Sequence, residues 1–221
     1  MPTIIKENYL KALLFLNQQS DAITITQLGE VMGVSKPTVN DMVKKLKSAG
    51  WVEHEKYQPI HLTKEGQMKA ALVVRKHRLS EMFLCEIMGF GWEEVHEIAE
   101  QLEHIRSEQF FDRMDELLGF PKVDPHGSPI PDRNGHLEHP HYPLLSQIML
   151  GKVVVKGLAE SSTSFLKFLN NKNIRLGTIL TITGKEDFDG SMVVHYNEHQ
   201  QETLSASVTE RLLVEVVNGA S

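Results

Sequence analysis

Apolar residues recur at three- and four-residue intervals in the first part of the chain, which is the spacing of amphipathic helices. This spacing predicts a helix over residues 4–17 and two short helices separated by Gly33, whose missing side chain suits a tight turn. We expect Thr26 and Ser35 to cap these two helices, because a side-chain oxygen can accept a hydrogen bond from the first turn. The second helix is expected to end at Gly50.

Two short helices around a glycine turn are typical of a helix-turn-helix, and a hairpin is predicted next, with residues 51–54 paired to residues 60–63. In a winged helix-turn-helix the second helix lies in the DNA major groove. There Asn40 can contact adenine and Lys36 a guanine or a phosphate, while other lysines contact the backbone. A helical core with a hairpin and no DNA role stays open as the alternative. The candidate DNA contacts are Ser35, Lys36, Pro37, Thr38, Asn40, Asp41, Lys44 and Lys45.

Three further helices are predicted, over residues 63–88, 92–106 and 107–118. In the first of these, His77 and Glu81 are one turn apart and share a face. In the second, four side chains fall within roughly 100° of one another on the helix surface. These side chains are His96, Glu100, Glu103 and His104.

Imidazoles and carboxylates gathered in this way are typical of a metal site, because packed carboxylates repel one another unless a cation lies among them. One site could use His77, Glu81 and His96, and another Glu100, Glu103 and His104. A donor set without thiolates favours Mn²⁺ or Fe²⁺ over a structural zinc. Cys85 follows Glu81 by one turn, but a buried, apolar-like cysteine is the simpler interpretation. Hydrogen-bonded histidines and solvated glutamates remain the alternative.

Composition limits the class of protein. The chain has 221 residues and a hydrophobic fraction of 41%, which is ordinary for a soluble protein, and its single cysteine fits a reducing cytoplasm. No apolar run approaches the roughly 20 residues of a membrane span, so we expect no membrane partner. The net charge is −6, yet residues 1–75 carry 10 basic and 7 acidic side chains against 13 and 22 in the remainder. A mildly basic head on an acidic body fits DNA binding.

The remaining chain divides into a linker and a strand-rich region. Residues 120–143 are rich in Pro, Gly, His and Asp without a period, and the histidines there are expected to be solvated, namely His126, His136, His139 and His141. From residue 150 onward, five strands and a short helix over residues 161–169 predict a small barrel. The predicted fold is mainly α, with a winged helix-turn-helix at 1–73, a helical metal-binding and dimerisation domain with the linker at 74–143, and a β-domain at 144–221.

Seven stretches in this order resemble the diphtheria toxin repressor family of iron- and manganese-dependent transcriptional regulators. The resemblance covers nearly the whole chain, and its motifs are Glu7–Leu10, Lys36–Asn40, Arg75–Leu79, His96–Glu100, Glu103–His104, Pro125–Pro131 and Ile174–Gly177. It implies that the β-domain is the SH3-like domain of the longer members.

The resemblance also implies two metal sites per subunit. An ancillary site would use His77, Glu81 and His96, with Glu160 of the SH3-like domain as a candidate further ligand. The primary, regulatory site would use a set that also includes a residue near the N-terminus, and His77 can serve this site too. The residues of the primary set are Glu100, Glu103, His104 and Asn8.

Two positions bear on the choice of metal. Iron-type members of the family carry a cysteine where this chain has Glu100, and a glutamate there resembles the manganese type. Manganese-type members carry an aspartate where this chain has Asn8, which offers a neutral and weaker oxygen ligand. We therefore expect Mn²⁺ as the cofactor, with Fe²⁺ as the second choice.

The resemblance implies a repressor that controls metal homeostasis genes and binds palindromic double-stranded operator DNA as a homodimer. Two rival functions are a winged-helix regulator gated by an organic ligand and a metalloenzyme. A helical His-Glu-x-x-His motif and a second acid/base cluster are missing from the sequence, which disfavours the enzyme. No organic cofactor is expected. Residues 84–118 are the predicted dimer interface, with Leu84, Met88, Phe90, Trp92, Phe110, Phe111 and Leu117 as candidates.

Overall fold

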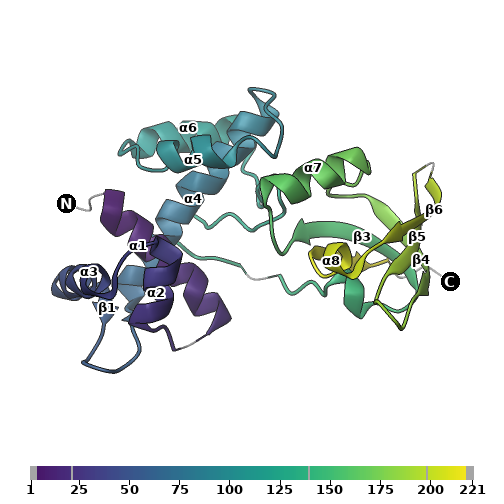
Figure 1. Ribbon diagram of the computed structural model, residues 1–221. Helices are drawn as coiled ribbons and strands as arrows, with labels where there is room; N and C mark the ends of the chain where they lie inside the picture. Colours follow the sequence, from purple (N-terminus) through teal and green to yellow (C-terminus); the bar gives the residue numbers. More distant parts are fainter. Residues whose placement is uncertain (1–3, 21, 139, 198, 218–221) are drawn as a thin grey trace. The chain divides into compact units, whose positions relative to one another are not determined.

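The computed structural model describes residues 4–20, 22–138, 140–197 and 199–217, which form two compact units. The first unit consists of described residues within 1–80, 98–122 and 130–138, and the second of those within 81–97, 123–129 and 139–221 (Figure 1). Each unit is therefore built from segments that are distant in sequence. The division into three domains at residues 73 and 143 stays a prediction.

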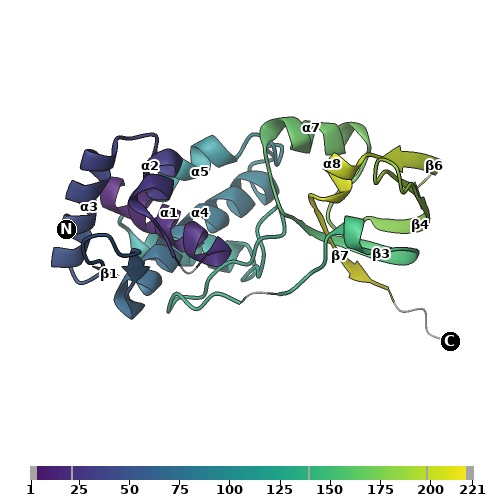
Figure 2. The same cartoon turned by 60° about the horizontal axis from the view of Figure 1, so that its bottom comes forward.

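The N-terminal part of the first unit is the predicted winged helix-turn-helix (Figure 2). Apolar side chains from all of its elements share one core, in which Leu10, Leu28 and Leu46 are almost completely buried. In the wing, Val52 pairs with Leu62 in antiparallel register. The elements are α1 (Ile4–Gln19), α2 (Ile25–Met32), α3 (Lys36–Ser48), β1 (Val52–Glu53) and β2 (His61–Leu62).

The capping of α2 differs from the prediction, because Thr24 and not Thr26 is its N-cap. Thr24 Oγ1 accepts a hydrogen bond from the Gln27 backbone N–H at 3.2 Å, and Gln27 Oε1 accepts one from the Thr24 N–H at 2.9 Å. This reciprocal pair requires a Gln or Glu three residues after the cap, which Thr24 has. Ser35 does precede α3, but its hydroxyl pairs with the Thr38 hydroxyl instead of a backbone N–H. Gly33 adopts the left-handed conformation of a tight turn, with φ of +64°.

Three helices follow, and the second is shorter than predicted. They are α4 (Lys64–Glu86), α5 (His96–Leu102) and α6 (Glu108–Leu117). The expected helix over residues 92–106 begins only at residue 96, because Glu94 closes a separate turn on Gly91 through its backbone N–H and its carboxylate. It ends at residue 102, so two of the four predicted stripe residues follow the helix instead of lying on it.

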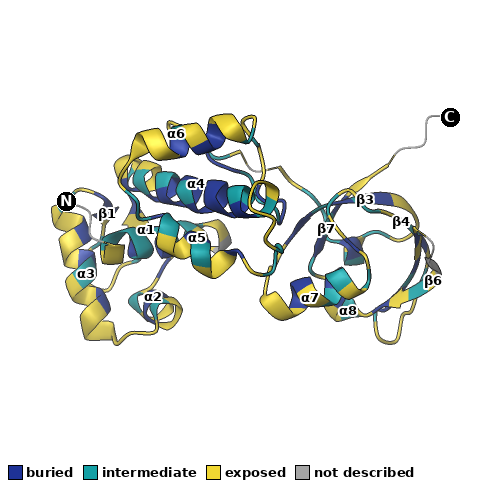
Figure 3. Ribbon diagram, turned by 90° about the horizontal axis from the view of Figure 1, so that it is seen from above, coloured by how far each residue is buried: buried dark blue, intermediate teal, exposed yellow. Residues whose placement is uncertain are grey.

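Helix α4 is buried along much of its length (Figure 3). Its first turn is capped by Thr63 Oγ1, which accepts the Gly66 N–H at 3.0 Å. Its buried face carries charged groups as well as apolar ones. Arg75 donates hydrogen bonds to the Asp115 carboxylate and to the Pro131 carbonyl, so this buried guanidinium is paired.

The second unit contains, within its described residues, an antiparallel five-stranded sheet in the order β6-β5-β4-β3-β7. Inward-facing residues of the strands and of α7 form one core that includes Val153, Leu180 and Leu169. This agrees with the predicted small barrel and with an SH3-like domain. Its elements are η1 (Leu145–Gln147), β3 (Gly151–Leu158), α7 (Thr163–Asn171), β4 (Ile179–Lys185), β5 (Met192–Tyr196), β6 (His199–Leu204), α8 (Ala206–Thr209) and β7 (Leu212–Val216).

The segment predicted as a linker contains an ordered loop over residues 123–129 of the second unit. Asp124 Oδ1 accepts the backbone N–H groups of His126 and Ser128 at 2.8 and 2.9 Å. The His126 carbonyl accepts the Leu158 N–H of β3 at 3.0 Å. His126 is therefore buried, and the expectation that it is solvated was wrong because the turn formed by Asp124 was not recognised.

The other linker histidines behave differently. His136 and His141 are exposed, and His139 lies outside the described residues. None of the described helices combines the length and the apolar character that crossing a membrane would require.

Candidate metal centre

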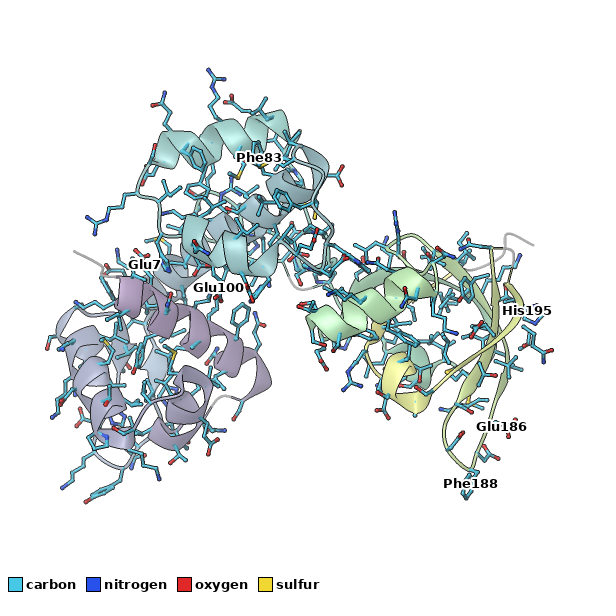
Figure 4. All side chains as sticks on the ribbon, turned by 45° about the horizontal axis from the view of Figure 1, so that its top comes forward. Glu7, Phe83, Glu100, Glu186, Phe188 and His195 are labelled. Carbon is cyan, nitrogen blue, oxygen red and sulfur yellow. The ribbon has the colours of Figure 1, made fainter. Side chains whose placement is uncertain are left out.

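Glu103 is the centre of a cluster of charged side chains in the first unit. Its side chain is fully buried, and its Oε2 lies 2.6 Å from His77 Nδ1 of α4. Lys11 of α1 donates to both carboxylate oxygens, at 2.7 Å for Oε1 and 2.8 Å for Oε2. We call Glu7, Lys11, His77, Glu100, Glu103 and His104 the Glu103 cluster. Figure 4 labels Glu7 on α1 and Glu100 on α5.

The N-terminal helix α1 supplies a second contact to this cluster. Glu7 Oε2 lies 2.6 Å from His104 Nδ1, and the opposite ring nitrogen of His104 lies 3.6 Å from Glu103 Oε1. Asn8 lies beside Glu7, and its Oδ1 is buried without a hydrogen-bond partner among the described residues. An unsatisfied buried carbonyl oxygen is uncommon and is available to a cation.

Glu103 stays ionised in this setting. Burial alone would raise the pKa of its carboxyl group, but the hydrogen bond with His77 and the charge of Lys11 outweigh burial and lower that pKa. Glu100 is exposed by contrast, and its Oε1 lies 3.4 Å from Lys11 Nζ. The two carboxylates therefore share one ammonium group.

A second cluster lies in the second unit and consists of Glu81, Asp124 and His126, all buried. One ligand atom of each lies within 4.8 Å of the others. His96 Nδ1 is 3.3 Å from Glu81 Oε1, so this exposed imidazole borders the same carboxylate. We call these four residues the Glu81 cluster.

The orientation of His126 suits ligation. Its Nε2 lies 2.9 Å from the Trp92 carbonyl oxygen, which can only accept a hydrogen bond, so Nε2 carries the proton. Nδ1 then faces Glu81 Oε2 at 3.7 Å. Burial alone would lower the pKa of His126, but the nearby Glu81 carboxylate and the charge of Asp124 raise it overall. A carbonyl that holds the distal nitrogen is the usual support of a metal-binding histidine.

The two clusters contain several of the residues predicted from the sequence and four that were not predicted. The structure brings Glu103 to His77 and Glu81 to His96, while His104 joins Glu7. Sequence reasoning missed Lys11, Glu7, Asp124 and His126. The available signals were the one-turn spacing of Glu7 and Lys11 on the first helix, and an Asp-Pro-His-Gly turn inside the supposed linker.

Two further side chains have other surroundings. The Glu160 carboxylate is 2.6 Å from Arg211 Nε, and this ion pair lowers its pKa. Cys85 is partly buried, and burial together with the charge of Glu81 raises the pKa of its thiol to about 12. Cys85 is therefore a neutral thiol at neutral pH, in agreement with its interpretation as an apolar-like residue.

The candidate DNA contacts lie on the outer surface of the head. All eight residues, from Ser35 to Lys45, are exposed at the start and along the outer face of α3. Asn40 Nδ2 donates to the Lys36 carbonyl at 3.0 Å, and Lys44 lies 3.5 Å from Asp41. Tyr57 near the wing tip has 88% of its surface exposed.

A winged helix-turn-helix joined to buried imidazole and carboxylate clusters is the architecture of a metal-dependent DNA-binding regulator. Two family models match the chain: "Iron dependent repressor, N-terminal DNA binding domain" at residues 3–60, and "Iron dependent repressor, metal binding and dimerisation domain" at residues 63–132. The chain belongs to this family of iron- and manganese-dependent repressors, as its sequence motifs predicted. The family is one of DNA-binding transcriptional regulators and not of enzymes.

Individual relatives support this assignment. The iron-dependent repressor IdeR of Mycobacterium tuberculosis (strain ATCC 25618 / H37Rv) is 34% identical over 125 residues, which is 57% of this chain and 54% of IdeR. The match thus spans about half the length of that relative. The diphtheria toxin repressor of Corynebacterium efficiens is 26% identical over 227 residues, or 96% of each chain.

Solved structures extend the similarity to the whole chain. A manganese-dependent transcriptional repressor in complex with manganese is 30% identical, with a TM-score of 0.83 over 96% of this chain and 100% of that chain. ScaR with bound Cd²⁺ is 31% identical, with a TM-score of 0.79 over 98% of this chain and 100% of that chain. These similarities confirm the predicted fold class. Metals are thus bound by proteins of the same fold and family.

Proposed function

We propose that this protein is a transcriptional repressor that binds operator DNA as a homodimer when Mn²⁺ or Fe²⁺ is bound. The observation that carries the proposal is the double role of α1. Tyr9, Leu10 and Leu13 of this helix are buried in the core of the DNA-binding head. On the same helix, Lys11 contacts Glu103 and Glu7 contacts His104. A change of cation at the cluster therefore acts directly on the helix that carries the head.

The donors of both clusters are carboxylates and imidazoles, which Mn²⁺ and Fe²⁺ accept. For the primary site we propose a set in which His77 is included because it contacts Glu103, and Asn8 because its Oδ1 lacks a partner. A bound divalent cation supplies the positive charge that these carboxylates require. The proposed primary ligands are Asn8, His77, Glu100, Glu103 and His104.

For the ancillary site we propose the predicted residues His77, Glu81 and His96, and the geometry of the second unit adds Asp124 and His126 beside Glu81. Glu160 stays a candidate by resemblance, although its carboxylate is held by Arg211. The two clusters support the proposal of two sites per subunit. Glu100 supports Mn²⁺ ahead of Fe²⁺, because by resemblance the iron-type members carry a cysteine at this position.

On the DNA side we propose that the start of α3 enters the major groove. Lys36 and Asn40 then reach base edges, while Lys44 and Lys45 contact phosphates and contribute affinity without sequence information. A homodimer on a palindromic operator places its two recognition helices about 34 Å apart, or a multiple of that distance. The protein would act in the cytoplasm, where its operator lies.

A titration of labelled operator-length DNA with and without Mn²⁺ tests the proposal. By linkage, removal of Mn²⁺ with a chelator should weaken DNA binding by a factor of roughly 5 to 150. Glu103→Ala should remove most of this dependence, because the most deeply buried carboxylate of the primary set is lost. Glu97→Ala, an exposed acidic position on α5, is the matched control and should respond to Mn²⁺ as the wild type does.

Two results would contradict parts of the proposal. DNA binding that is insensitive to chelation would exclude metal dependence and favour a regulator gated by an organic ligand. An unchanged response of Glu103→Ala to Mn²⁺ would exclude the primary site assigned here.

A further inference from the structure

Lys11 occupies the position in the Glu103 cluster that a cation is expected to take. Its side chain is 13% exposed, and its ammonium group bonds both oxygens of the fully buried Glu103 carboxylate and reaches Glu100 at 3.4 Å. The cluster holds three carboxylates, from Glu7, Glu100 and Glu103, and Lys11 is the permanently charged base that contacts two of them. His77 and His104 can add charge only when protonated.

This contact conflicts with simultaneous metal ligation. Glu103 Oε1 is bonded to Lys11, and Oε2 is shared between Lys11 and His77. A divalent cation binds through the same oxygen lone pairs, and it repels an ammonium group held within hydrogen-bond distance of those oxygens. The ammonium group and a divalent cation therefore exclude each other from this carboxylate.

We propose that Lys11 is a tethered counter-cation that competes with the divalent metal for Glu103 and Glu100. The inference rests on the proposed function, in that the Glu103 cluster takes a divalent cation. Lys11 keeps the buried carboxylate paired in the metal-free protein, where an unpaired buried charge would be strongly destabilising. It also weakens metal binding, so that the site fills only at a higher metal concentration.

The exchange has a consequence for α1. In the metal-free state Lys11 and Glu7 tie this helix to the cluster. When metal replaces the ammonium group, Lys11 is released, and Asn8 is the neighbouring group on α1 that offers an unpaired oxygen. The helix is thus held in both states but through different residues, which is what a two-state switch needs.

Mn²⁺ binding by the full-length Lys11→Met variant tests this proposal. Binding is followed from the electron paramagnetic resonance signal of free Mn²⁺, in a His126→Ala background that weakens the Glu81 cluster. Removing the competing charge should tighten binding at the Glu103 cluster at least roughly tenfold. Lys11→Arg keeps the charge and should stay near the wild-type affinity, and Lys122→Met, at an exposed lysine, should leave it unchanged.

Protein stability provides a second measurement, since Lys11→Met leaves Glu103 without its ammonium partner. The chelated variant should melt at a lower temperature than the wild type, and Mn²⁺ should raise its melting temperature by more than it raises that of the wild type. The double variant Lys11→Met/Glu103→Gln lacks both charges, so it should regain thermal stability and bind Mn²⁺ weakly.

The competing outcomes are separable. A folded Lys11→Met variant that binds Mn²⁺ with unchanged or weaker affinity overturns the role of Lys11, as does a variant that stays unfolded in saturating Mn²⁺. If the wild-type cluster binds no Mn²⁺ but Lys11→Met does, the competition is supported while the proposed metal dependence of the wild type fails.

Discussion

Glu103 keeps its negative charge although burial alone would raise its pKa. Two helices supply its partners: Lys11 of α1 provides the opposite charge, and His77 of α4 contacts its Oε2. The pKa of Glu103 is therefore lower in the folded protein than the usual value of a glutamate. A group with a lowered folded-state pKa stabilises the protein above its unfolded-state pKa, and this stabilisation is lost as the pH falls through the folded-state pKa.

The lowered pKa of Glu103 leads to a prediction for the pH dependence of stability in the metal-free protein. Below about pH 5, the free energy of unfolding of the wild type should fall more steeply with decreasing pH than that of Glu103→Gln, which cannot titrate. Urea denaturation in the presence of a chelator, measured at several pH values, provides the comparison. Parallel pH profiles for the two proteins would show that Glu103 has no lowered pKa.

Only some of the residues of the site could be predicted from the sequence. The types and approximate positions of Glu103, His77 and Glu81 follow from helical spacing. Lys11 and His126 do not, since the first contacts a residue 92 positions away and the second depends on a turn inside an irregular segment. Contacts between distant parts of the chain are fixed by tertiary packing, which periodicity does not encode.

The loop over residues 123–129 shows how an irregular element positions a functional side chain. Gly127 has φ of +86°, and a Cβ atom at this position would lie 2.3 Å from the Lys156 carbonyl oxygen of β3. The same loop is tied to β3 by the hydrogen bond between His126 and Leu158. Glycine is thus required both by the backbone angle and by the close approach of β3.

We predict that Gly127→Ala destabilises the protein by about 2–4 kcal/mol and weakens metal binding at the Glu81 cluster, because His126 must shift. Gly151→Ala on β3 is the matched control. It has φ of +119° but open space around the position of a Cβ atom, so a backbone cost of about 1–2 kcal/mol is expected without loss of metal. Thermal unfolding and metal titration of both variants provide the measurements. Equal effects would rule out the clash with β3.

At the level of elements the sequence predicted the winged helix-turn-helix, the three helices that follow and the small β-domain. The differences lie at their ends. Helix α2 begins at Ile25, earlier than a cap at Thr26 would place its start, because Thr24 forms the capping box with Gln27. Helix α5 is confined to His96–Leu102 because Glu94 closes a separate turn before it. Side-chain hydrogen bonds decide such boundaries, and hydrophobic spacing does not report them.

The apolar side chains that each unit leaves exposed are candidates for contact between two copies of the chain. In the first unit, Phe110 and Leu117 of α6 are 40% and 67% exposed, and in the second, Met88 is 57% exposed. Leu84 and Phe111, also proposed for the dimer interface, are buried within their own units. Exposed apolar side chains on the dimerisation domain are the better candidates for contact with a second copy.

We predict that Leu117→Glu weakens self-association by at least roughly tenfold and reduces operator affinity in parallel, since a buried, unpaired carboxylate is costly at an interface. Gln109→Glu introduces the same charge at an exposed position of α6 and serves as the control. Sedimentation velocity over a range of concentrations measures the assembly. A Leu117→Glu protein that remains a dimer as stable as the control would exclude α6 from the interface.

The bonds between the recognition helix and the wing have a consequence for how such a protein can evolve. Lys47 of α3 donates to the His54 carbonyl of the wing at 2.8 Å, and the Ile60 N–H bonds the Ile23 carbonyl before α2 at 2.8 Å. These two hydrogen bonds tie the wing to α3 and to the segment before α2. Under the proposed function, we therefore expect a signal that arrives through α1 to alter the orientation of the head and to leave its contact surface intact. Under the proposed function, sequence preference and metal sensitivity depend on separate residues, so each could change by mutation without changing the other.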